Sequence, residues 1–103
     1  MATFVALIHD TCMSTRTIRE TVNHLTAFEY LAKRMQITLK EIYWTYGQYD
    51  GIVILEAPDY EKVSALMTLL SSTNSVQTEV LRAYSRNEMN QILTRFERLS
   101  SNN

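Results

Sequence analysis

The sequence predicts an α+β domain of the ferredoxin-like type, with the element order βαββαβ followed by a last helix. One observation is that short apolar runs of strand-forming residues alternate along the chain with longer segments whose apolar residues recur every three or four positions. Another is the glycine between the middle pair of strand runs, which suits a tight turn. Right-handed crossovers in the two strand–helix–strand halves then place both main helices on one face of an antiparallel sheet.

The first half begins with a strand and continues as an amphipathic helix. Residues 4–9 are apolar strand formers. Thr17 and Glu20 match a capping box, in which a hydroxyl and a carboxylate satisfy free amides at a helix start. The apolar stripe expected to face the core is Ile18, Val22, Leu25, Phe28, Leu31, Ala32 and Met35.

The middle of the chain is typical of a β-hairpin. Strands are expected at residues 37–46 and 49–57, joined by Gly47-Gln48 in a two-residue type II′ turn. Such a turn fixes the register, so that Trp44 lies opposite Gly51. One sheet face then carries Lys40, Ile42, Trp44, Tyr46, Tyr49, Gly51, Val53 and Leu55, and the other carries Leu39, Glu41, Tyr43, Thr45, Asp50, Ile52, Ile54 and Glu56.

The second half repeats the helix–strand order. Pro58 ends the hairpin, and Asp59 is a good N-cap for a helix whose apolar stripe is Val63, Leu66, Met67 and Leu70. A strand follows at residues 76–84. Ser85 and Glu88 form a second capping box for a last helix, and its buried face is expected to be Met89, Ile92, Leu93 and Phe96.

Length and charge limit the function. The chain has 103 residues, enough for one domain, which we place at residues 1–99 with a disordered tail at 100–103. Its net charge of −1, from 10 basic and 11 acidic residues, argues against binding nucleic acid or an anionic membrane. The single cysteine, Cys12, allows no intramolecular disulfide, and no signal peptide is recognised, so a cytoplasmic location is expected.

A subunit interface is expected on the sheet face that the helices leave uncovered. This face mixes apolar side chains with carboxylates, which is more typical of an interface than of open surface. A two-fold dimer, or a higher even-numbered oligomer, is the commonest way to cover it. The residues expected there are Glu41, Tyr43, Ile52, Ile54, Glu56 and Arg82.

The aromatic cluster at residues 43–50 is the candidate binding site. The ligand-binding residues that we expect are Trp44, Tyr46, Tyr49 and Asp50, although the same rings can simply pack against the sheet. Asp50 can be a structural acceptor for backbone amides or a general base. His9 is the candidate for proton transfer. No metal site is expected, because the spacing of His and Cys residues is not that of metal ligands.

The same residues carry a family resemblance. Residues 43–45, the Gly47-x-Tyr49-Asp50 segment, residues 56–59 and residues 78–83 together resemble the GYD-domain family of small bacterial and archaeal proteins. The resemblance implies a dimeric α/β barrel, in which two ferredoxin-like units pack sheet to sheet. It implies no settled activity. This chain departs from relatives at Gln48, where a basic residue is common, and at Gln36-Ile37, where a glycine is common.

Two function classes follow. The first is a homo-oligomeric domain of uncharacterised activity that binds a small molecule or serves assembly, with no cofactor. The alternative is a cofactor-free enzyme of the dimeric α/β-barrel type, similar to monooxygenases or isomerases, that acts on a small aromatic or apolar substrate through His9 and Asp50.

Overall fold

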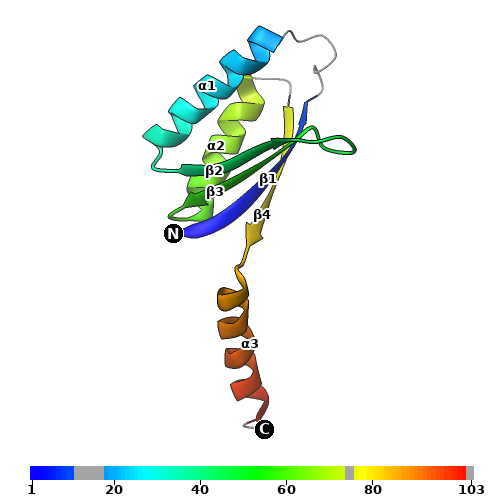
Figure 1. Ribbon diagram of the computed structural model, residues 1–103. Helices are drawn as coiled ribbons and strands as arrows, with labels where there is room; N and C mark the ends of the chain where they lie inside the picture. The colour runs from blue at the N-terminus through cyan, green and yellow to red at the C-terminus, as the bar shows by residue number, and fades with distance from the viewer. Residues whose placement is uncertain (11–17, 74–75, 102–103) are drawn as a thin grey trace.

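A four-stranded antiparallel sheet with two helices against one face forms the body of the protein in a computed structural model (Figure 1). The structure describes residues 1–10, 18–73 and 76–101. The strand order is β2-β3-β1-β4, as in ferredoxin-like domains, so the predicted fold class is confirmed. The elements are β1 (Ala2–Asp10), α1 (Ile18–Arg34), β2 (Thr38–Trp44), β3 (Gly51–Ala57), α2 (Tyr60–Thr73), β4 (Val76–Ala83) and α3 (Arg86–Ser101).

The core lies between the sheet and the two helices α1 and α2. Alternate residues of β1 and β3 point into it. From the predicted helix stripes, the core is met by Phe28, Leu31, Ala32, Met35, Val63, Leu66, Met67 and Leu70. Leu55, Val63 and Leu66 are its largest fully buried side chains. The buried apolar residues are Phe4, Ala6, Phe28, Ala32, Ile37, Val53, Leu55, Ala57, Val63, Leu66 and Met67.

Two of the three predicted helix caps are present in the structure. The Lys62 amide donates to Asp59 Oδ1 at 2.9 Å, so the N-cap of α2 is confirmed. At α3 the Glu88 amide donates to Ser85 Oγ at 3.1 Å and the Ser85 amide donates to Glu88 Oε1 at 3.0 Å, which confirms the second capping box. Thr17 lies outside the described residues, so the first capping box stays a prediction.

A β-bulge in β2 changes which side chains face the core. The predicted pairs Trp44–Gly51, Tyr43–Ile52 and Glu41–Ile54 are confirmed, but the register shifts between Leu39 and Glu41. The extra residue turns Leu39 toward the core, against which it packs, and leaves Lys40 beside Glu56 with Nζ 3.2 Å from Oε1. The predicted faces of Leu39 and Lys40 were therefore wrong.

The hairpin has a longer connection than predicted. The β2–β3 ladder ends at Trp44 and Gly51, so residues 45–50 form a six-residue loop instead of a two-residue turn. The cause is a competing partner, because the Asp50 amide donates to the Ile8 carbonyl at 2.7 Å and so binds to β1. The Thr45 amide still donates to the Asp50 carbonyl at 3.0 Å, and Gly47 has the expected positive φ, 131°.

Helix α3 projects away from the body, beyond the end of β4 (Figure 1). Its predicted buried face is exposed in the single chain, since Met89, Leu93 and Phe96 are 40%, 52% and 62% exposed. That prediction was wrong for the single chain, because contacts of Arg82 with Tyr84 and Glu88 hold the first turn of α3 beyond the end of β4. The helix continues to Ser101, into the segment that was expected to be a tail.

We predict a large loss of stability when the core of α2 is truncated. Leu66→Ala removes a fully buried side chain and should lower the free energy of unfolding by about 2–5 kcal/mol. Leu69→Ala on the same helix, where the side chain is 42% exposed, is the matched control and should cost far less. Urea unfolding followed by circular dichroism measures both, and equal losses would contradict this description of the core.

Candidate ligand site on the open sheet face

The sheet face opposite α1 and α2, which we call the open face, is not covered by any helix among the described residues of the chain. Its apolar centre comes from alternate residues of β1 and β3, namely Val5, Leu7, Ile52 and Ile54, and these four are only partly buried. Because they alternate with the buried residues of the same strands, they point away from the core. Acidic side chains and further apolar ones surround the centre: Glu41, Tyr43, Glu56, Glu79 and Leu81.

His9 and Asp50 meet at one end of the open face. His9 Nδ1 lies 3.2 Å from Asp50 Oδ2, with the two side chains 47% and 27% exposed. The same carboxylate oxygen accepts a hydrogen bond from the Asp10 amide at 2.7 Å. Asp50 is thereby fixed to β1 at both its backbone and its side chain, and its carboxylate orients the imidazole.

Tyr49 extends the site toward β4. Its hydroxyl donates to Glu79 Oε2 at 2.6 Å, so the ring spans from the hairpin loop to the far edge strand. This hydrogen bond raises the pKa of the Tyr49 phenol above its ordinary value, with smaller contributions from burial and from the negative charge of Glu79. Thr45 Oγ1 donates to the Tyr49 carbonyl at 2.6 Å and holds the loop in this position.

A hollow of about 410 Å³ lies beside these side chains. Its lining comes from β1, the hairpin loop and β4, and each lining side chain carries a polar group. The residues that line it are His9, Gln48, Tyr49, Gln77, Thr78 and Glu79. It offers imidazole, phenol, amide and carboxylate groups within a small space, which suits a small ligand with several hydrogen-bonding atoms.

The sequence prediction placed only part of this site. The structure brings His9, Tyr49 and Asp50 together, but Trp44 is 59% exposed and Tyr46 is fully exposed, and neither lines the hollow. Gln48, Gln77 and Glu79 line it and were not among the predicted site residues. Strand alternation could have found the last two, because β4 pairs with β1 and places Gln77 opposite His9.

The predicted interface residues lie on the open face with one exception. Arg82 pairs with the buried Phe4 in the sheet and points to the helix side instead. Its guanidinium carbon is 5.5 Å from the centroid of the Phe4 ring and 4.3 Å from that of Tyr84. Arg82 also donates to the Thr3 carbonyl at 3.1 Å and reaches Glu88 at 3.4 Å. It therefore belongs to the joint between β4 and α3, and its predicted position was wrong.

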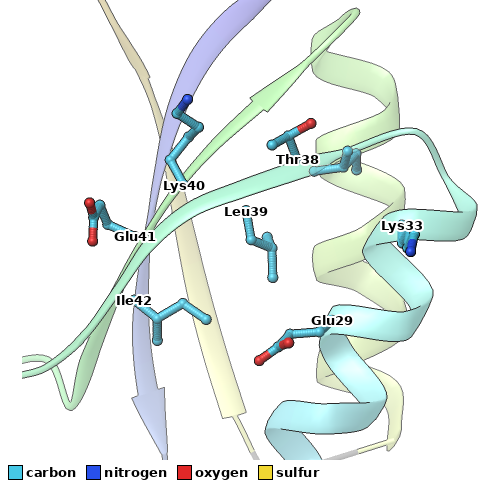
Figure 2. Close-up of a pocket in the computed structure, with 8 residues that line it drawn as sticks. Glu29, Lys33, Thr38, Leu39, Lys40, Glu41 and Ile42 are labelled. Carbon is cyan, nitrogen blue, oxygen red and sulfur yellow. The ribbon is translucent and has the colours of Figure 1, made fainter.

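A second hollow, of about 530 Å³, lies between α1 and the edge strand β2 (Figure 2). Leu39 and Ile42 point to the α1 side of β2, whereas Lys40 points away from it. Glu29 and Lys33 supply the α1 wall. Although larger, this hollow lacks a histidine or a phenol, so we regard the smaller one as the chemically richer candidate.

In residues 1–10, 18–73 and 76–101, no group of three or more His, Cys, Asp or Glu side chains is gathered as a metal site would require. No helix among the same residues has both the length and the apolarity needed to span a membrane.

The topology and the size of the chain define a small ferredoxin-like α+β domain. The chain belongs to the GYD domain family, whose model matches residues 4–93. The resemblance inferred from its motifs is thus confirmed. No curated protein matches the chain in sequence.

Solved structures share the fold. The leucine response regulatory protein LrpA of Mycobacterium tuberculosis aligns with 82% of this chain at a TM-score of 0.56 and 10% identity, and this match spans 51% of LrpA, about half its length. FFRP-DM1 aligns with 82% of this chain at a TM-score of 0.55 and 24% identity, and the match spans 100% of the FFRP-DM1 chain. The hypothetical protein PHS023 of Pyrococcus horikoshii aligns with 84% of this chain at a TM-score of 0.52 and 22% identity, and the match spans 93% of PHS023.

We predict that Glu79 controls the ionisation of Tyr49. Glu79→Gln removes the negative charge and weakens the hydrogen bond, so the pKa of the Tyr49 phenol should fall toward its ordinary value of 10.0. Absorbance titration of tyrosinate, with Tyr49→Phe subtracted to isolate the ring, measures the shift. Glu41→Gln is the control, because it removes a carboxylate from the open face on β2, the opposite edge of the sheet from Glu79.

The sign of the pH effect on stability follows from the same contact. Because the folded state raises the pKa of Tyr49, it holds the proton more tightly than the unfolded chain does. The contribution of this contact to the free energy of unfolding is therefore complete below the pKa of Tyr49 in the unfolded chain. It is lost as the pH rises through the pKa of Tyr49 in the folded protein. Thermal unfolding of Tyr49→Phe should be less sensitive to pH in this alkaline range than that of the unaltered protein, and equal sensitivity would contradict the assignment.

Proposed function

We propose that this chain is a homo-oligomeric domain that binds a small polar molecule in the hollow beside His9, Tyr49 and Asp50. The observation that carries the proposal is the convergence of these three side chains with Glu79, from β1, the hairpin loop and β4, at one hollow. Side chains that are oriented by second hydrogen-bonding partners are pre-organised, which lowers the entropy cost of binding. The fold shared with LrpA does not by itself assign a ligand.

Self-association of the open face supports the same proposal. Val5, Leu7, Ile52 and Ile54 form an apolar centre on the open face, whereas the other face is packed against α1 and α2. Covering an apolar sheet face is favourable by roughly 25 cal/mol for each Å² removed from water. A second copy placed there by a two-fold axis would also roof the hollow, which lies at the end of the same face.

The polar lining favours a ligand that donates hydrogen bonds. Glu79 supplies a carboxylate acceptor in the lining, Gln48 and Gln77 supply amide oxygens, and Asp50 adds a second negative charge behind His9. A cationic or hydroxyl-rich small molecule satisfies these groups, whereas an anion would meet the Glu79 carboxylate.

The second candidate function is a cofactor-free enzyme, and the His9–Asp50 geometry is what favours it. A half-exposed imidazole held at 3.2 Å by a carboxylate is a common arrangement for a general base. A bound aromatic or apolar substrate that stacked on the exposed ring of Tyr46 or Trp44 at the loop could present its proton to His9.

Native mass spectrometry of the protein purified from its own source cells tests the binding proposal. We expect even-numbered subunit masses that carry a reproducible small-molecule mass. Asp50→Asn should lose that adduct and keep the oligomer, because it removes the negative charge that orients His9 beside the hollow. Asp59→Asn is the matched control, since asparagine also caps helices well, and it should keep both. An adduct that survives Asp50→Asn would contradict the assignment of the site.

The same preparation separates binding from catalysis. If the co-purified molecule is recovered unchanged after incubation with fresh protein, the domain binds without turnover. If its mass changes with unaltered protein and not with His9→Gln, the enzyme function replaces the binding function. His9→Gln keeps a polar side chain of similar reach and removes the titratable nitrogen.

We also predict that a charge in the centre of the open face disrupts self-association. Ile54→Glu places a carboxylate among apolar side chains, which in an interface would be buried without a partner. Sedimentation velocity should show a smaller assembly whose circular dichroism is unchanged. Leu69→Glu, on the helix side of the body, is the control and should leave the mass unaltered. Equal masses for all three proteins would rule out the open face as an interface.

A further inference from the structure

We propose that α3 is a second self-association surface and pairs with α3 of another copy in antiparallel orientation. This surface is distinct from the open face. It is suggested by the position of α3, by the apolar stripe along it and by the charges that flank the stripe.

The apolar stripe of α3 lacks a partner within its own chain. Met89, Leu93 and Phe96 are 40%, 52% and 62% exposed and share one side of the helix with the half-buried Ile92. Apart from the joint at its first turn, no other element in residues 1–10, 18–73 and 76–101 packs along α3. An isolated helix of this length is marginal in water, because nucleation is costly and only packing of the apolar side offsets it.

The joint with β4 directs the helix outward. Arg82 stacks on Tyr84 and reaches Glu88, and Glu88 in turn caps the helix through Ser85. These contacts fix the first turn of α3 relative to the end of β4, so the helix is presented to solvent in a defined direction (Figure 1). In this direction the stripe lies away from the sheet and from α1 and α2 of its own chain (Figure 1).

The charges beside the stripe are self-complementary. Arg86 and Glu88 lie in the first turn of α3, and Arg95 and Glu97 lie two turns later. In an antiparallel pair Arg86 falls opposite Glu97 of the second copy on one side of the stripe. Glu88 falls opposite Arg95 on the other side, and both pairings share one centre, between Gln91 and Ile92. One alignment therefore satisfies the charges and joins the apolar stripes.

The antiparallel orientation of the two α3 helices is favoured by the position of the sheet and of α1 and α2, which form the body of each copy. A parallel pair would bring both bodies together at the same end of two helices whose axes are about 8–10 Å apart. The antiparallel pair places them at opposite ends of an overlap about 24 Å long, estimated from the helical rise over α3. The contact is isologous and closed, so it joins two copies and no more. Together with a two-fold contact through the open face, it would close at four chains when the two axes cross at right angles.

Sedimentation velocity of full-length variants tests the surface. Leu93→Glu with Phe96→Glu puts two charges into the stripe and should raise the dissociation constant of the α3 contact at least tenfold. At protein concentrations below the raised constant, the mass of the assembly should halve. Gln91→Glu with Thr94→Glu puts the same charges on the opposite side of α3 and should leave the mass unchanged. Equal masses for the two double variants would overturn the proposal and leave the stripe to a partner of another kind.

Self-cross-linking tests the orientation in a Cys12→Ser background. Ile92 lies at the centre of the antiparallel overlap, so Ile92→Cys should form a disulfide with its counterpart under mild oxidation. Met89→Cys should not, because its counterpart is about 8 Å away along the axis. Cross-linking of both would indicate a parallel pair, and cross-linking of neither would exclude the contact; either result overturns the proposal.

The tests of the α3 contact can succeed or fail independently of the tests of the open face and of ligand binding. Ile54→Glu should keep the Ile92→Cys cross-link, and Leu93→Glu with Phe96→Glu should keep the co-purified small molecule. Loss of the cross-link in the Ile54→Glu background would show that α3 is not an independent surface.

Discussion

The burial of one sheet face, and only one, is the constraint on which the rest of this structure depends. Phe4 and Ala6 in the central strand β1 point under the helices, together with Val53 and Leu55 from β3. Strand alternation then forces their neighbours to the other side, where Val5, Leu7, Ile52 and Ile54 meet solvent. Both α1 and α2 lie on one face, so the apolar area of the other is available for another molecule.

Asp50 connects this architecture to the candidate site. Its backbone amide and its carboxylate both bind to β1, which draws the hairpin loop across the end of the sheet and brings Tyr49 toward β4. The residue is thus structural and lies beside His9 at the same time. The two roles that the sequence left open for Asp50 are compatible, because one oxygen can accept a backbone amide while the carboxylate still carries its charge.

Alternation and helical periodicity were sufficient to predict the element order, the fold class, the second capping box and the hairpin register near Trp44 and Gly51. They could not predict features whose partners are distant in sequence. The hairpin loop departs from a tight turn because Asp50 binds to Ile8 and Asp10, forty residues away. The bulge at Lys40 has no local signal. The exposed stripe of α3 was recognised as apolar, but periodicity does not say which molecule covers it.

The same bulge has a consequence for how copies of this chain can associate. β2 is an edge strand, and a regular edge with free amides and carbonyls can recruit the edge of another sheet without limit, as in amyloid. The extra residue breaks the hydrogen-bonding repeat of β2, and the Lys40 ammonium, close to the Glu56 carboxylate, adds a charge beside it. The fold thus discourages open-ended growth at this edge of the sheet.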